Sequence, residues 1–440
     1  MKKSYAFLLA VWILAGGPWL SVADAAGAEE PFGAEDPFSV LEGAQGMQVD
    51  SPAPQKTGRK PEVRAEVFFK GYEADISNAS RINPGNRIQD LKEFTGSVET
   101  RMTVADYLNR QETVRWLFKG FAAGSNYHLA DGTPRNKEAR VDELFVDWKG
   151  DDLFVSIGKR RINWGHARGF NPVNAVAPPR DPINPNYQTE GRPMIWGSLR
   201  GAQGTVDVIL TRNYDGNWNS DQNRWGLKWG GARGDTDYAL YYFDGAPYPD
   251  GRAYERMAGA SFTAVAAPGI TLYMEAAGVE RNYRNYYAPN GGIQRKSGGF
   301  FQGVIGSSLD MGGKSGLFVE YFFNGQGYSG DERINYLQTA DARLGNGSDK
   351  TLMEDFTALA MNRSYILASL NKEFREKYTF ALSVLMAGDS SSSTRAEVAY
   401  ALSDYYEARM VYLYNAGGRD TEFGNSPYKG LFEIGIKASF

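Results

Sequence analysis

The chain has 440 residues, a formal net charge of −4, 13% aromatic residues, 51 glycines and no cysteine, and its mean hydropathy is −0.45. Without cysteine it can form neither a disulfide framework nor a cysteine metal site, and a pI near 5.6 argues against a nucleic-acid binder. The longest uninterrupted apolar run, residues 6–15, falls short of the roughly 17–25 residues of a bilayer-spanning helix, so helical membrane insertion is excluded.

The N-terminus has the order of features typical of a secretory signal peptide. Lys2 and Lys3 precede the apolar run, a Gly-Gly-Pro break follows it, and Ala23-Asp24-Ala25 places small residues at the two positions that a signal peptidase reads. We therefore expect residues 1–25 to be a signal peptide that is cut after Ala25. The alternative interpretation is a buried N-terminal helix.

Residues 26–60 are rich in proline, glycine, alanine and acidic residues and show no periodicity. Such a composition cannot bury a core, so we expect a disordered periplasmic tail. The tail holds two near-repeats, Glu30-Pro31-Phe32 and Asp36-Pro37-Phe38. We interpret them as part of a plain tether, with docking of a periplasmic partner as the alternative.

Two-residue alternation runs from residue 61 to the C-terminus. It is clearest in the last segment, where Ile434, Ile436 and Phe440 fall on one face and Glu433 and Lys437 fall on the other. One face suits lipid and the other suits water. A soluble sandwich also alternates, but these segments reach the ~9–11 residues of a tilted membrane-spanning strand. The same pattern occurs in the segments 63–70, 224–229, 378–386, 394–402 and 406–414.

Short turns alternate strictly with longer polar links that are rich in glycine, asparagine and proline. The short turns fall at 106–112, 149–152, 202–204, 230–235, 266–269, 311–314, 374–377 and 403–405. The longer links fall at 77–90, 125–138, 163–193, 213–223, 244–252, 283–298, 325–362, 388–393 and 416–427. Eight short and nine long connections predict 18 strands, or 16 if one hairpin is miscounted.

This alternation predicts an all-β fold for residues 61–440: a transmembrane antiparallel β-barrel with short periplasmic turns and long extracellular loops. The barrel must close, because an open edge in hydrocarbon would leave backbone amides unsatisfied. A barrel of 16–18 strands has an aqueous interior unless loops fill it.

The terminal Phe440 on an alternating strand, the signal peptide and the turn pattern resemble those of Gram-negative outer-membrane porins, and the strand count also resembles that of the alginate-export family. The stretch from Gly158 to Gly165, with Phe170-Asn171-Pro172 and the proline-rich 178–182, resembles uncharacterised porin-like proteins of proteobacteria. The resemblance implies an outer-membrane location among lipid and lipopolysaccharide. It also implies recognition of Phe440 by the barrel-assembly machinery.

The link 163–193 lies between the fifth and sixth predicted strands, where porins fold a loop into the pore. It holds six of the nineteen prolines, which stiffen it. We expect it to form the pore constriction, with a bias towards anions. The alternative is that its arginines pair with Asp181, Glu190 and wall carboxylates and only pin the loop. The expected constriction residues are Arg160, Arg161, His166, Arg168, Arg180 and Arg192.

The inward-facing positions of the predicted strands carry twelve basic and twelve acidic side chains, and the acidic ones include Glu143, Glu275 and Glu320. This balance predicts a paired, solvated wall.

Two further links suggest local structure. Leu352, Phe356 and Ala360 belong to a helical stripe that could either plug the pore or cap the surface by packing on neighbouring loops. The link 215–221 places oxygen-bearing side chains at alternate positions, as calcium loops do, but lacks their terminal glutamate, which favours an Asx-rich turn.

Catalysis is poorly supported. The only histidines are His128 and His166, and the sequence contains no Gly-x-Ser-x-Gly element and no phosphate-binding loop. We expect no enzyme activity, no cofactor and no metal. The leading hypothesis is a passive channel for small hydrophilic solutes. The alternatives are a sheath or export conduit for a polymer or partner protein, with the tail as docking element, and a closed barrel that acts as an adhesin or anchor.

Overall fold

The computed structural model describes residues 61–126, 136–176, 181–184, 190–212, 223–244, 256–282, 284–312, 314–344, 352, 356 and 360–440. Residues Gln55–Phe440 form one compact unit. The expected signal peptide, the tail and the Asx-rich link 215–221 lie outside the described residues, so they stay predictions.

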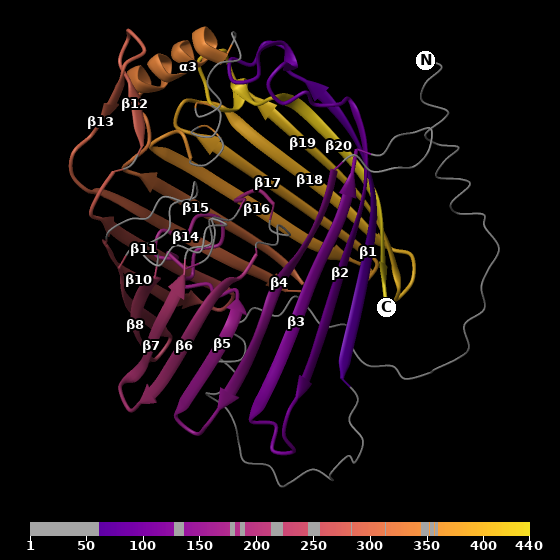
Figure 1. Cartoon of the computed structure of the whole chain (residues 1–440), viewed down its shortest axis with the longest axis vertical. Coiled ribbons are helices and arrows are strands. Elements are labelled where there is room, and N and C mark those ends of the chain that lie inside the picture. Colours follow the sequence, from indigo (N-terminus) through magenta and orange to yellow (C-terminus); the bar gives the residue numbers. More distant parts are fainter. Residues whose placement is uncertain are drawn as a thin grey trace, which may run out of the picture. The chain divides into compact units, whose positions relative to one another are not determined.

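Eighteen antiparallel strands form one closed sheet (Figure 1). Each strand pairs with its neighbours in chain order, and β1 pairs with both β2 and β20, which closes the barrel. The predicted fold class and the count of 18 strands are confirmed. The strands are β1 Glu62–Ile76, β2 Phe94–Tyr107, β3 Val114–Ser125, β4 Asn136–Lys149, β5 Leu153–Arg160, β6 Arg192–Gly201, β7 Gly204–Arg212, β8 Asn223–Arg233, β9 Thr236–Asp244, β10 Arg256–Ala267, β11 Ile270–Val279, β14 Phe300–Gly312, β15 Ser315–Asn324, β16 Ser364–Phe374, β17 Tyr378–Ala387, β18 Ser392–Ala401, β19 Tyr406–Ala416 and β20 Tyr428–Ser439.

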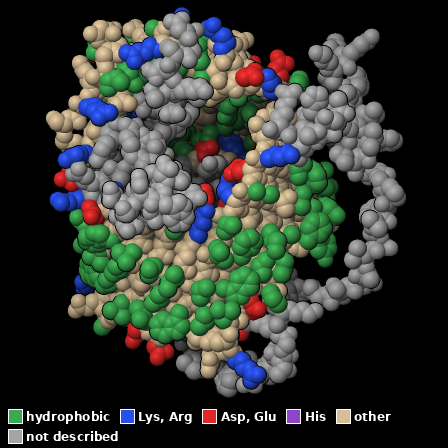
Figure 2. Space-filling view, in the orientation of Figure 1, with side chains coloured by type: hydrophobic (Ala, Val, Ile, Leu, Met, Phe, Trp, Pro, Cys, Tyr) green, Lys and Arg blue, Asp and Glu red, His purple; other side chains and the backbone are tan. Residues whose placement is uncertain are grey.

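The alternation of the sequence sorts the side chains between the two faces of this sheet. On β20, Phe432 and Ile436 are exposed on the outside, whereas Glu433 between them is buried inside. On β19, Met410 and Tyr412 face out and Val411 faces in. The outward residues of the strands together form a hydrophobic band, and Figure 2 shows one face of it in green. A band of this kind is what a β-barrel presents to lipid.

The connections differ at the two ends of the barrel. All eight predicted short turns join consecutive strands at one end, the short-turn end, and the longer links join them at the other, the long-loop end. The long-loop end carries the hairpin of β12 (Asn285–Tyr287) and β13 (Ile293–Arg295), the helix α3 (Gly330–Leu344) and the short helices η2 (Pro84–Asn86) and η4 (Phe423–Asn425) (Figure 1).

Helix α3 was not predicted, although the sequence signals its start. The amide of Ser329 donates to Glu332 Oε2 at 2.8 Å, and the amide of Glu332 donates to Ser329 Oγ at 3.4 Å. This reciprocal pair is a capping box, readable in the sequence as Ser-x-x-Glu. No helix among the described residues is long and apolar enough to span a bilayer.

The predicted helical stripe after residue 351 falls mostly outside the described residues. Leu352 is described, and it is buried with Ile82, Tyr287 and Tyr336 in a cluster built from several long loops and α3. Phe356 packs against the same cluster. These contacts favour the surface cap over the plug.

Candidate functional site: a loop held across the barrel interior

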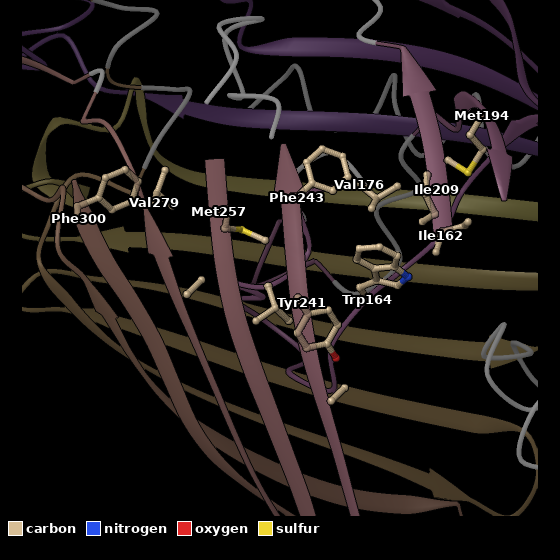
Figure 3. Close-up of a cluster of buried hydrophobic side chains, with 14 residues drawn as sticks. Ile162, Trp164, Val176, Met194, Ile209, Tyr241, Phe243, Met257, Val279 and Phe300 are labelled. Carbon is tan, nitrogen blue, oxygen red and sulfur yellow. The ribbon is translucent and has the colours of Figure 1, made fainter. Parts of the chain in front are cut away.

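The described part of the link between β5 and β6, residues 161–176, 181–184, 190 and 191, enters the barrel and covers a largely apolar part of its inner wall. Ile162, Trp164 and Val176 of this loop are buried against inward-facing side chains of β6–β11 and β14 (Figure 3). The ring of Trp164 lies 5.9 Å from that of Tyr241 and 6.4 Å from that of Phe243. The wall partners are Met194, Ile209, Ala239, Tyr241, Phe243, Met257, Ala277, Val279 and Phe300.

The same loop continues onto the inner faces of β11 and β14–β17. The ring of Phe170 stacks on that of Phe322 with centroids 4.3 Å apart and lies 5.4 Å from the ring of Tyr365. Ala167 and Ile183 are buried in the same cluster. Because so much apolar surface is removed from water on both sides of the contact, the hydrophobic effect holds the loop inside the barrel.

Two buried carboxylates fix the backbone of the loop at its far side. Glu275 on β11 is 2% exposed, and its Oε1 accepts hydrogen bonds from the amides of His166 and Ala167, the latter at 2.7 Å. Glu320 on β15 is fully buried. Its Oε1 accepts from the amide of Arg168 at 2.6 Å.

Glu320 uses both of its oxygens. Besides the Arg168 amide, Oε1 accepts the hydroxyl of Tyr273 at 2.9 Å, and Oε2 accepts the amides of Gly169 at 2.9 Å and Phe170 at 3.2 Å. Five consecutive backbone amides, from His166 to Phe170, therefore point at two wall carboxylates. We call this set of hydrogen bonds the latch. A hydrogen bond contributes about 0.5–1.5 kcal/mol net, and about 1.5–3 kcal/mol where the acceptor is ionised, so five together hold the loop backbone firmly.

Glycine is required where the loop meets the latch. Gly165 has φ +96°, and a Cβ there would lie 2.5 Å from Glu275 Oε1 and 2.6 Å from Asn171 Oδ1. Only glycine adopts this backbone conformation at little cost and lets the loop backbone lie so close to Glu275 and Asn171.

The predicted constriction residues at the two ends of the loop lie on the β4–β6 side of the wall. Arg160 and Arg192 are cross-strand partners where the loop leaves and rejoins the sheet. Arg160 forms an ion pair with Asp147, and its guanidinium lies 4.4 Å from the ring centre of Phe145. The amide of Arg161 donates to Glu143 Oε1 at 2.9 Å.

The remaining predicted residues lie elsewhere. His166 and Arg168 are exposed on the segment held by the latch, with the Arg168 guanidinium 5.6 Å from the ring centre of Phe318 on β15. Arg180 lies outside the described residues. Glu190 pairs with Lys159, and Asp181 is within electrostatic reach of Arg395 on β18.

The inner wall of β18–β20 and β1–β4 is charged. Arg409 on β19 bonds Glu433 on β20 at 2.8 Å and lies 3.8 Å from Glu397 on β18, which also pairs with Arg395. The chain of ion pairs continues around this wall, as the sequence predicted. Its further members are Lys437–Glu407, Lys70–Glu99, Arg101–Glu99 and Lys119–Glu143.

A buried polar cluster holds several long loops together at the long-loop end of the barrel. The carboxylate of Glu422 accepts hydrogen bonds from the Tyr365 hydroxyl at 2.6 Å and from Asn362 Nδ2 at 2.7 Å. The backbone amide of Glu422 donates to Asp389 Oδ2 at 2.7 Å. Arg333 of α3 donates to Asn362 Oδ1 at 2.9 Å. Arg333 also pairs with Asp389 at 3.5 Å and donates to the carbonyl of Asp420 at 2.9 Å, so the helix is tied to the links 388–391 and 417–427.

The latch was only half visible in the sequence. Glu275 and Glu320 stand out as inward-facing carboxylates, but the expected partners of such carboxylates were the arginine side chains of the loop, not its backbone amides. No sequence pattern predicts which carboxylate will accept hydrogen bonds from consecutive backbone amides more than a hundred residues away. Among the described residues, no group of three or more histidine or acidic side chains could hold a metal ion.

A closed antiparallel sheet with a hydrophobic outer band and a charged interior is a porin-like β-barrel. No protein-family model and no curated protein match the sequence. Solved structures that resemble the chain include engineered variants of the porin of Rhodopseudomonas blastica, at 9–10% identity and TM-scores of 0.43–0.45, covering 87% of this chain and 100% of theirs. Nothing about solute or pore follows from a similarity of this size.

Proposed function

We propose that the protein is an outer-membrane channel for the passive diffusion of small hydrophilic solutes. The observation that carries the proposal is the contrast between the hydrophobic outer band of the closed barrel and its interior, which is lined on one side by ion pairs. A wall of buried ion pairs is costly in a dry interior, whereas water and passing solutes solvate it in an open one.

The passage runs between the loop 161–191 and the charged wall of β18–β20 and β1–β4. The described part of the loop packs on the largely apolar inner wall of β6–β17. In this proposal solutes pass along the polar side, where they can keep their hydration. Figure 2 supports this arrangement, because the molecule is hollowed near the long-loop end and acidic and basic side chains line the hollow. In this proposal the loop sets the radius of the pore.

Ion selectivity is expected to be weak. Many of the described charges of the wall form pairs of opposite sign, and Arg160, one of the six residues expected to attract anions, pairs with Asp147. A marked anion preference would instead support the role expected for Arg161, His166, Arg168, Arg180 and Arg192.

The membrane partners proposed for the barrel are outer-membrane lipid and lipopolysaccharide. Phe440 is 66% exposed at the short-turn end, while its backbone pairs with that of Ala65 on β1. The side chain of Phe440 is thus accessible, while its backbone takes part in closing the barrel. An accessible terminal aromatic ring suits recognition by the assembly machinery during insertion.

Reconstitution into planar bilayers tests the channel. We expect ohmic steps of current and a reversal potential close to zero in a KCl gradient, because the wall charges balance. Absence of conductance from protein that has refolded to a detergent-resistant barrel would refute the channel proposal.

A further inference from the structure

Glu275 and Glu320 both hold the loop, yet their oxygens are used differently. Glu320 needs two acceptor oxygens, because amides of the loop donate to Oε1 and to Oε2. The two described amide hydrogen bonds of Glu275 both end on Oε1, and its buried Oε2 accepts none among the described residues. The amide of Val173 also faces Glu275, without meeting hydrogen-bond geometry to Oε2.

This difference decides what a neutral isostere does at each position. A glutamine amide keeps one acceptor oxygen and turns the other into an NH2 donor. At position 320 that NH2 group must face either the amide of Arg168 with the hydroxyl of Tyr273, or the amides of Gly169 and Phe170. In either orientation the NH2 group faces at least one backbone amide, and both groups are hydrogen-bond donors. Because the site is fully buried, the donor left without an acceptor costs free energy.

At position 275 the oxygen of a glutamine can stay against the amides of His166 and Ala167. The NH2 group then takes the place of Oε2, where it displaces no described hydrogen bond.

We infer that Glu320 is the positioning residue of the pore constriction, and that its full set of acceptors holds the loop across the barrel, while Glu275 is a secondary support that tolerates loss of its charge. The inference rests on the proposed function for its effect on current, but the latch itself can be tested without current. Glu320 then fixes the pore radius through the loop backbone and touches no solute.

The test uses the absence of native cysteine. Ala167 is 2% exposed beneath the latch, so an Ala167→Cys variant carries a single thiol that reacts with N-ethylmaleimide only when the loop lifts. This substitution is combined with Glu320→Gln, with Glu275→Gln, or with the control Glu433→Gln, which removes a buried carboxylate that pairs with Arg409 on the charged wall. Each protein is first shown to be a folded, detergent-resistant barrel.

We expect Glu320→Gln to raise the labelling rate by roughly 10–100-fold, since one lost hydrogen bond to a charged acceptor shifts the opening equilibrium by that factor. Glu275→Gln should change the rate by less than about threefold, and Glu433→Gln should leave it unchanged. In bilayers, Glu320→Gln should add current noise and raise the mean conductance. If Glu320→Gln does not refold, Glu320→Asp supplies the test, because a shorter carboxylate keeps its charge but cannot reach both pairs of donors, and its labelling should also rise.

Equal labelling of the Glu320→Gln and Glu275→Gln proteins, or faster labelling of the latter, would overturn the inference. A thiol that becomes reactive in Glu320→Gln in a protein that never conducts would refute the channel and leave the latch intact. Conductance with a thiol equally protected in all backgrounds would refute the latch alone.

Discussion

At the scale of single residues, the interior loop depends on close backbone contacts that a single methyl group can disturb. Gly165 combines a positive φ with a lack of space, since its Cβ would strike Glu275 and Asn171. Gly298 has a similar φ of +101° but open space around it. The two positions therefore separate backbone strain from steric conflict.

We predict that Gly165→Ala destabilises the barrel by about 2–5 kcal/mol, from roughly 1–2 kcal/mol of backbone strain plus 1–3 kcal/mol of overpacking. Gly298→Ala should cost only the strain, about 1–2 kcal/mol. Urea unfolding of the detergent-folded protein, followed by tryptophan fluorescence, measures both. Equal losses at the two positions would mean that the latch does not confine Gly165.

The residue scale is also where prediction from sequence failed most. The link 163–193 was expected to fold inwards because it lies between the fifth and sixth predicted strands, as in porins, and its described residues do pack on the inner wall. The partners of that loop were missed, since carboxylate recognition of backbone amides depends on where strands β11 and β15 bring Glu275 and Glu320. That placement is fixed by the register of the whole sheet.

At the scale of elements, the long loops are held together by the cluster around Glu422 and Asp389, and both groups lie outside the strands. Burial raises the pKa of Glu422, and the nearby Asp389 adds to the effect. Burial alone would also raise the pKa of Asp389, but hydrogen bonds from Ser391, the Glu422 amide and Asn362 outweigh it and lower the pKa. The two carboxyls therefore respond to acid in opposite ways.

We predict a stability optimum for the loop cluster in mild acid. A carboxyl with a raised pKa takes up its proton more readily when folded, so Glu422 adds stability as the pH falls through its folded pKa. Asp389 has a lowered pKa, so its contribution is present above its ordinary value, about 3.9, and is lost as the pH falls further through its folded pKa.

Hydrogen exchange of the segment 417–427 across a pH series, corrected for intrinsic exchange rates, measures this profile. Asp389→Asn should remove the loss of protection at the acid end and lower protection at neutral pH. Protection that falls steadily from neutral pH downwards in the native chain would contradict the assignment for Glu422.

The elements themselves were largely predictable. Period-two alternation and turn residues identify most of the strands. Around 194–211 and 252–265 the alternation is poor, and the strict order of short and long connections predicts the strands there. Helix α3 was not predicted because its capping box, Ser329 with Glu332, is a short signal in a polar link without a clear apolar stripe.

At the scale of the whole molecule, the described part of the loop packs on a largely apolar part of the inner wall, which also holds Glu275 and Glu320, whereas the inner wall of β18–β20 and β1–β4 carries ion pairs. This division explains why the interior is not a uniform polar lining. It also explains why the mean hydropathy of −0.45 resembles that of a soluble protein, since the outer band and the covered wall are diluted by charged residues on the other faces.

We propose that solutes pass along the charged side of the loop. Two single-cysteine proteins test it most directly: Thr103→Cys, on the inward face of β2 among the charged wall, and Ala277→Cys, buried under the loop on β11. With a cationic methanethiosulfonate reagent applied to open channels in a planar bilayer, we predict a stepwise loss of current for Thr103→Cys and no change for Ala277→Cys. Loss of current for Ala277→Cys with no loss for Thr103→Cys would refute this path for solutes.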